Sequence, residues 1–221
     1  MADAFIYYSL ESALRGGLKG DSRCSSMAGI TTVQQGLLGE NEFWKLVVVG
    51  SHGTVEPRRP LPDDERIDFL IHPRGSIEPM LAFQVKTAMN LHRQGKADIF
   101  SIRFYVRPNR LVTHPRFWYF LAHFDQRIMT FRTPVFLVPS TYLHPLGFRD
   151  KTNRFGFMVK LSLDPASKDR WVPFRSSTGE VGGRIQAILR KFPIESRRER
   201  LEWRAVLRTP NAGARQVSPA A

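Results

Sequence analysis

The sequence contains a single cysteine, Cys24, in a serine-rich stretch. It can therefore form no internal disulfide bond and no thiolate zinc cluster. It also contains no apolar run of the roughly 18 to 20 residues that span a bilayer. The opening stretch MADAFIYYSLESALRG lacks the basic and apolar segments of a signal peptide. We therefore expect a cytoplasmic protein that does not enter a membrane.

Acidic residues are scarce relative to basic ones. The chain has 33 Lys and Arg residues against 20 Asp and Glu residues, which gives a formal net charge of +13 over 221 residues. A surface of this charge attracts polyanions, and composition alone leaves nucleic acid and an anionic membrane surface as the leading partners. Hydrophobic residues make up 42% of the chain, which is enough for one domain with a sizeable core.

The composition divides the chain into three parts. Residues 1–30 are rich in Gly and Ser and poorly periodic, which predicts a poorly structured leader. Residues 31–192 carry helix-like and strand-like patterns and are expected to form an α/β domain. Residues 193–221 contain a short Arg-rich segment and then a tail without an apolar pattern, which predicts a basic and partly disordered end.

Two helices are predicted from apolar spacing and capping residues. The spacing of Val33, Leu37 and Phe43 is helical, and Thr31 stands where a capping residue is expected. The stretch 176–192 combines a Ser/Thr/Gly start with Ile and Leu on one side. Its Gly-rich beginning lacks the Gly-Lys-Ser/Thr ending of a phosphate-binding loop, so we interpret it as a helix cap.

Strands are predicted between and beyond these helices. The first helix is expected to give way to a strand at 45–50, followed by a turn-rich loop at 51–65. The aromatic run 116–124 is interpreted as a core strand and not as a platform for bases. The strand-like runs after the loop lie at 66–71, 80–88, 99–106, 116–124, 134–139 and 155–163.

Two neighbouring runs carry polar side chains that are unusual in buried strands. In RIDFLIHPRGSIEPMLAFQVKTAM, at 66–89, one apolar run contains Asp68 and the next contains Gln84 and Lys86. Ionised groups are costly to bury unless they are paired or bind a metal. Alternate residues of a strand share a face, so pairing of the two runs as a hairpin would bring these three side chains to one side of a sheet.

Such a group of side chains has a plain chemical use. Carboxylate and amide oxygens are hard ligands suited to Mg²⁺ or Mn²⁺, which activate water and neutralise charge on a phosphoryl oxygen. Lys86 is then placed to orient or deprotonate the attacking water, or to hold the phosphate. Glu40 on the preceding helix offers a further carboxylate, with Glu42 as the competing choice. Asp63 and Asp64 either cap a turn or reach the metal.

The pattern resembles the PD-(D/E)XK nuclease superfamily, and more closely its uncharacterised bacterial families that carry Gln-x-Lys. The resemblance rests on Asp68, on Gln84 and Lys86 after a gap of 15 residues, and on Glu40 in GLLGENEF, and it covers about 33–140. It implies a restriction-endonuclease-like core: a helix, a three-stranded meander, a helix and a further strand, in a mixed sheet flanked by helices. Extra C-terminal strands and a helix would extend that core.

The resemblance also implies an activity. It implies Mg²⁺-dependent cleavage of phosphodiester bonds in DNA, with Asp68, Gln84 and Glu40 as metal ligands and Lys86 as the catalytic lysine. Most members of the superfamily have Glu or Asp where this chain has Gln84, although some of its homing endonucleases also carry Gln-x-Lys. An amide brings the metal no charge, so the site is either more dependent on Asp68 and Glu40 or inactive.

Two alternatives therefore stand beside the nuclease. One is a non-catalytic nucleic-acid-binding module on the same fold, and the other is a protein-interaction component of a mobile-element or defence system. DNA is the expected partner, RNA remains open, and a homodimer would be natural for an enzyme that cuts a duplex. Basic residues expected to contact phosphates, unless they form a solvated face, are Arg93, Lys96, Arg103, Arg107 and Arg110, with a tail cluster of Arg197, Arg198, Arg200, Arg204 and Arg208.

Overall fold

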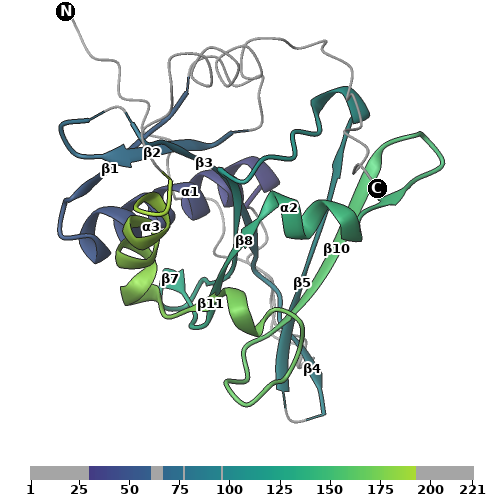
Figure 1. The fold of residues 1–221 in the computed structure, drawn as a ribbon. Coiled ribbons are helices and arrows are strands. Elements are labelled where there is room, and N and C mark those ends of the chain that lie inside the picture. Colours follow the sequence, from purple (N-terminus) through teal and green to yellow (C-terminus); the bar gives the residue numbers. More distant parts are fainter. Residues whose placement is uncertain (1–29, 61–66, 77, 96, 193–221) are drawn as a thin grey trace, which may run out of the picture. The chain divides into compact units, whose positions relative to one another are not determined.

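The computed structural model of the chain describes residues 30–60, 67–76, 78–95 and 97–192 (Figure 1). From Thr31 onward these residues belong to one compact unit. The predicted leader and basic C-terminal segment lie outside the described residues, as do Asp63, Asp64 and Lys96. Within the described part, none of the helices has the length and apolarity needed to cross a membrane.

The first helix, α1, extends from Thr32 to Gly50 and is longer than predicted. Its cap is confirmed: the Thr31 hydroxyl accepts the N–H of Gln34, and the Gln34 side chain accepts the N–H of Thr31. The predicted strand at 45–50 is wrong, because these residues form the last turns of α1. Val47 is fully buried there, so packing outweighs the modest helix penalty of β-branched side chains.

A mixed sheet, sheet A, forms the centre of the unit. Its described strands follow the order β1-β2-β3-β6-β8-β11, with β7 paired to β6. Strands β3 and β6 are parallel, and the other pairs are antiparallel. The strands are β1 (Val55–Arg58), β2 (Phe69–Pro73), β3 (Leu81–Ala88), β6 (Phe117–Asp125), β7 (Thr130–Phe131), β8 (Val135–Pro139) and β11 (Arg175–Ser176).

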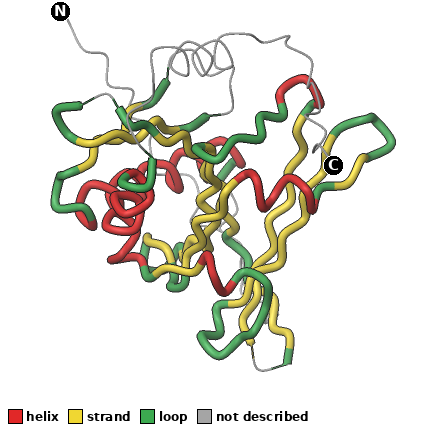
Figure 2. The backbone as a smooth tube through the Cα atoms, in the orientation of Figure 1, coloured by secondary structure: helices red, strands yellow, loops and turns green. Residues whose placement is uncertain are grey.

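A second, antiparallel sheet, sheet B, has the described order β4-β5-β10-β9. Figure 2 shows its two long strands, β5 and β10, running side by side. The strands are β4 (His92–Gln94), β5 (Ala97–Val106), β9 (Phe148–Arg149) and β10 (Phe155–Ser162). The short helices are η2 (Pro108–Arg110), α2 (Ser140–Leu143), η3 (His144–Leu146), η4 (Val172–Phe174) and η5 (Thr178–Glu180).

Sheet A is covered on both faces. Helices α1 and α3 (Val181–Leu189) cover one face, where Phe43 packs against Phe83 and Ile185 belongs to the same core. Sheet B and α2 cover the other face, where Phe100 and Leu143 share a core with Tyr119. The predicted α/β class, with a central mixed sheet flanked by helices and extra C-terminal strands and a helix, is therefore confirmed. The six strand-like runs after residue 65 all contain strands.

Two expectations about the connections are wrong. The segment 51–65 was expected to be a loop, yet it contains β1, whose Val55 and Pro57 turn toward the interior. The resemblance implied a helix between the meander and the further strand. The described residues between β3 and β6 instead form β4, β5 and the single turn η2. The reason is the alternation of Phe100, Ile102 and Val106 into the core, which suits a strand.

The predicted cap of the C-terminal helix is confirmed. Ser177 and Glu180 form a capping box at η5, which leads directly into α3. The first turn of α3 crosses the end of α1 at close range. A Cβ atom built on Gly182 would collide with backbone atoms of Val47, Gly50 and Ser51, so this crossing requires glycine.

We predict that Gly182→Ala destabilises the protein by about 2 kcal/mol or more, because the added methyl group meets backbone that cannot move aside. Gly183→Ala is the matched control. A Cβ at Gly183 has the Gly50 carbonyl oxygen at 3.7 Å as its nearest neighbour, so alanine should stabilise the helix by about 0.5 to 1 kcal/mol. Urea unfolding of both variants tests the crossing, and equal midpoints would contradict it.

Candidate functional site

The candidate site lies where β2 and β3 separate. The two strands pair from Ile71↔Leu81 to Phe69↔Phe83, and their regular ladder ends there. Asp68 precedes the first residue of β2, and its N–H donates to the Phe83 carbonyl at 2.9 Å. Beyond this point β3 continues beside β6 as far as Ala88. The predicted hairpin therefore exists, and Asp68 stands at its open end.

The Asp68 carboxylate joins the two strands at this end. Its Oδ2 accepts the N–H of Val85 at 2.6 Å. A backbone N–H in this half-buried position needs an acceptor, and the carboxylate takes the place of a carbonyl from β2. The same contact holds Asp68 against the residue between Gln84 and Lys86. The carboxylate therefore has a structural function that is independent of any chemistry.

Gln84 and Lys86 lie on one face of β3, as alternation requires. Ala82, two residues earlier, belongs to the core between the sheets, whereas Val85 packs under α1. Both polar side chains therefore turn away from α1. Gln84 is only 3% exposed, and Lys86 is half-buried. The amide lies deeper than the ammonium group, so access from solvent is through Lys86 and Asp68.

Glu40 approaches the same end of β2 from α1, with Arg59 as the intermediary. The Arg59 guanidinium lies 3.5 Å from a Glu40 carboxylate oxygen and donates to Asn41 at 2.8 Å. It also lies over the ring of Phe69, 5.5 Å from the ring centre. Phe69 directly follows Asp68, so Arg59 ties the Glu40 side chain to this part of the sheet. Arg59 was not anticipated from the sequence, because it stands in a segment expected to be loop.

Glu42, the competing choice for the helix carboxylate, lies beside β7 and not at the open end of the hairpin. It is 7% exposed, accepts a hydrogen bond from the Thr130 hydroxyl on β7, and pairs with Lys45 at 2.6 Å. Strand β7 pairs with the end of β6 at Asp125, whereas Gln84 lies beside Tyr119 near the start of β6. Glu42 therefore stabilises the packing of α1 on β7 and does not face the candidate site.

The donor atoms at the open end fit a hard divalent cation. Asp68 brings carboxylate oxygens and Gln84 an amide oxygen, the ligand types that Mg²⁺ and Mn²⁺ accept. Across the described residues, no group of three or more His, Cys, Asp or Glu side chains is arranged to hold a metal ion. A cation at Asp68 would therefore depend on the Gln84 amide, and Glu40 would have to leave the α1 side of the sheet to join it.

The described basic residues expected to contact phosphates lie on and beside sheet B. Arg93 is exposed on β4, Arg107 precedes η2, and Arg110 is the last residue of η2. Arg107 borders a groove that it shares with Arg154 of the β9–β10 turn. These residues therefore belong to the second sheet and its connections, and not to the open end of the β2–β3 hairpin.

A second polar group is buried beside α2. His144 contacts the Thr113 hydroxyl through Nδ1 at 2.7 Å and the Tyr119 hydroxyl through Nε2 at 2.9 Å. Burial lowers the pKa of His144 to about 4. Burial, together with the charge of Arg116, lowers the pKa of nearby His114 to about 4. Both rings are therefore neutral at neutral pH, and His144 joins hydroxyls from two segments.

Comparison with known proteins gives only distant structural likeness. No family model matches the chain, and no curated protein matches it. Among solved structures, the chain is similar to the bacterial homing endonuclease I-Ssp6803I, with 14% sequence identity and a TM-score of 0.40. The match covers 70% of this chain and 93% of that one. A likeness this distant carries no function from one chain to the other.

We predict that Asp68→Ala lowers the free energy of unfolding by about 1 to 3 kcal/mol, because the Val85 N–H loses a charged acceptor. Asp68→Asn keeps an oxygen that can accept this hydrogen bond and should cost clearly less. Urea unfolding of both variants measures the difference. Equal losses would show that the hydrogen bond to Val85 contributes nothing to stability.

Acid should destabilise the protein through His144. Its folded pKa lies below the unfolded value, so its contribution to stability is complete above about pH 6.5 and is lost as the pH falls toward 4. The loss is about 3 kcal/mol at most. His144→Gln, which cannot titrate, should flatten the dependence of unfolding free energy on pH in this window. The exposed His92→Gln is the control, and an equal flattening in both variants would contradict the assignment.

Proposed function

We propose that the chain is a metal-dependent nuclease that hydrolyses phosphodiester bonds in DNA at the open end of the β2–β3 hairpin. The observation that carries the proposal is the hydrogen bond from the Val85 N–H to the Asp68 carboxylate. It fixes a carboxylate beside the segment of β3 that carries the buried amide of Gln84 and the half-buried ammonium group of Lys86. Polar and charged groups are costly to bury unless they are hydrogen-bonded, paired or bound to a metal, and a metal ion would satisfy the carboxylate and the amide together.

In this proposal Asp68 and Gln84 hold Mg²⁺ or Mn²⁺. Glu40 lies on the α1 side of sheet A, from which Gln84 turns away, so it would have to reach around the open end of the hairpin to complete the set. A bound ion of this kind supplies positive charge at a phosphoryl oxygen and lowers the pKa of coordinated water. Glu40 pairs with Arg59, so reaching the ion would require this contact to loosen or to bridge. The small number of anionic ligands favours weak ion binding that strengthens when a phosphate supplies further oxygens.

Lys86 is the proposed catalytic residue. It shares a face of β3 with Gln84 and stands one position beyond the Val85 anchor, so its ammonium group reaches the same place from the more exposed side. There it would orient the attacking water or hold the scissile phosphate by its charge. The strand fixes the position of its Cα atom, which leaves only the flexible stem to adjust.

The test is cleavage of supercoiled plasmid and of single-stranded DNA with Mg²⁺ or Mn²⁺. Lys86→Ala should lower the rate about 100-fold or more. Asp68→Asn should abolish cleavage while it preserves the fold. Gln84→Glu adds the missing charge and should lower the Mg²⁺ concentration required for half-maximal cleavage. The controls are the exposed Lys168→Ala and Glu56→Gln, a β1 carboxylate that pairs with Arg58.

Two outcomes would end the proposal. One is a wild type that binds DNA and never cuts it, whatever the divalent ion; the non-catalytic binding module then explains the chain. The other is cleavage that survives in Lys86→Ala and Asp68→Asn as well as it does in the controls. In that case the activity lies elsewhere on the molecule or comes from a contaminant.

A further inference from the structure

We infer that the outer face of sheet B binds single-stranded nucleic acid, with bases stacked on Phe148 and phosphates held by Arg103 and Lys160. The inference deepens the proposed function, on which it rests only in taking nucleic acid as the ligand. The surface is separate from the open end of the β2–β3 hairpin. Its evidence comes from strand register, exposure and charge.

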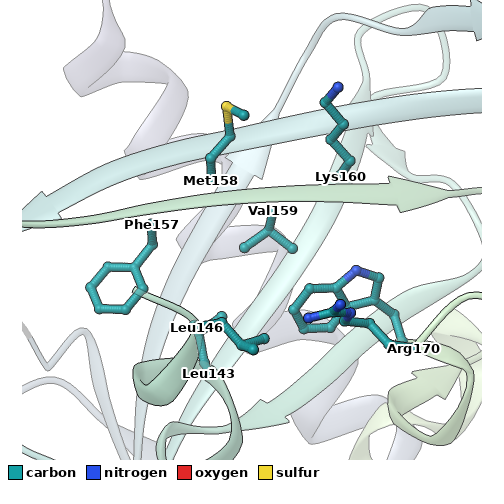
Figure 3. A pocket seen from close by; sticks show the side chains of 8 residues that line it. Leu143, Leu146, Phe157, Met158, Val159, Lys160 and Arg170 are labelled. Carbon is teal, nitrogen blue, oxygen red and sulfur yellow. The ribbon is translucent and has the colours of Figure 1, made fainter. Parts of the chain in front are cut away.

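Strand alternation defines the outer face. On β10, Phe157 and Val159 are buried in the core between the sheets, whereas Met158 and Lys160 are exposed. Figure 3 shows the side chains of Met158 and Lys160 on the opposite side of the strand from those of Phe157 and Val159. Leu143 and Leu146 lie on the same side as Phe157 and Val159. A pocket of about 280 Å³ at this edge of β10 is lined by these residues and also by Met158 and Lys160. The two sides of β10 therefore have different chemistry.

The register extends this face across the sheet. Arg103 of β5 is opposite Met158, and Ser101 is opposite Lys160. Residues directly opposite each other in an antiparallel pair point to the same side. The Arg103 guanidinium also donates to the Met158 sulfur at 3.2 Å, which places both side chains on this face.

Phe148 adds an aromatic surface at one end of the same face. It pairs with Gly156, whose other neighbour is Tyr105. A Cβ atom built on Gly156 would lie 2.7 Å from Cζ and 2.8 Å from Cε2 of Phe148, so the ring lies over the glycine. Phe148 is nevertheless 45% exposed. One side of the ring is thus supported by the strand, while much of the ring remains open to solvent.

The charges of sheet B favour a polyanion. Two acidic residues occur in the strands and connections at 92–110 and 148–162. Asp98 pairs with Arg132, and Asp150 pairs with Arg154. Among the described residues that alternate onto the outer face, none is acidic. The described basic residues of these two ranges are Arg93, Arg103, Arg107, Arg110, Arg149, Lys151, Arg154 and Lys160.

Stacking is what favours a single strand over a duplex. A duplex backbone needs cations alone, because its bases are stacked on one another. Unpaired bases stack on exposed aromatic side chains, and flat sheet faces that combine such side chains with Arg and Lys suit single strands. An exposed Phe148 at the end of a row that contains Met158 and Lys160 fits this second case.

The experiment measures binding by fluorescence anisotropy in EDTA, where no metal-dependent cleavage occurs. The probes are labelled oligothymidylate, the corresponding abasic strand and a hairpin duplex. Phe148→Ala should weaken oligothymidylate binding roughly ten-fold and leave the abasic strand unaffected, while Phe148→Tyr retains binding. Arg103→Gln and Lys160→Gln should each reduce the salt-dependence slope by about 0.7. Ile128→Ala, at a residue 60% exposed in the β6–β7 turn, is the control.

The inference is overturned if Phe148→Ala binds oligothymidylate as wild type does. It is also overturned if the hairpin duplex binds as tightly as the single strand and loses as much in each variant. Oligouridylate in the same assay distinguishes RNA from DNA as the source of the strand. A wild type that binds but never cuts refutes the nuclease and leaves this inference standing. A wild type that cuts, but binds no better than Phe148→Ala, refutes this inference alone.

Discussion

The architecture depends on how β3 is held along its two edges. On one edge β6 pairs with it in parallel over almost its full length, and on the other edge β2 accompanies it only from Leu81 to Phe83. The Asp68 carboxylate ends this partial pairing by accepting the Val85 N–H. A backbone carbonyl there would have continued the ladder and closed the sheet. A carboxylate satisfies the N–H equally well, and the pairing of β2 with β3 ends before it reaches Gln84 and Lys86.

In sheet B too, one strand combines a structural function with a surface that is open to solvent. Every second residue of β10 enters the core, so the strand is held firmly without using its outer side chains. Met158 and Lys160 are consequently exposed and take no part in the core. Gly156 has no side chain, which leaves room for the Phe148 ring. In β3 and β10, alternate residues lie on opposite faces, so the residues that pack in a core are not the ones that carry the polar chemistry. A substitution on the outer face should therefore change binding with little effect on folding.

Sequence reasoning predicted most of the strands, because their apolar runs are long and bounded by turn residues. It failed at Lys45 to Gly50, where a run of valines looks like a strand and is helical because Val47 packs into the core. It also failed at β1, where Pro57 and neighbouring turn residues concealed a short strand. Local composition does not predict the helical end of α1 or the strand β1, since both depend on tertiary packing.

The candidate site was predictable in part. Alternation and the hairpin turn were enough to place Asp68 beside the segment of β3 that carries Gln84 and Lys86. The choice between Glu40 and Glu42 was not decidable from spacing, because it depends on which side of α1 meets β7. Arg59 and the outer face of sheet B were also out of reach. The register that places Arg103 opposite Met158 pairs segments about fifty residues apart, and no local pattern encodes it.

In the proposed scheme, the outer face of sheet B compensates for weak cation binding at the open end of the β2–β3 hairpin. Gln84 lends a cation an oxygen without charge, so the hairpin site alone should bind a divalent ion weakly. Nucleic acid held on a basic sheet elsewhere in the same unit raises the effective concentration of phosphate at that site. Phosphate oxygens can then supply the negative charge that the amide lacks. Binding energy from remote contacts would in this way sustain a metal site that is poor in anionic ligands.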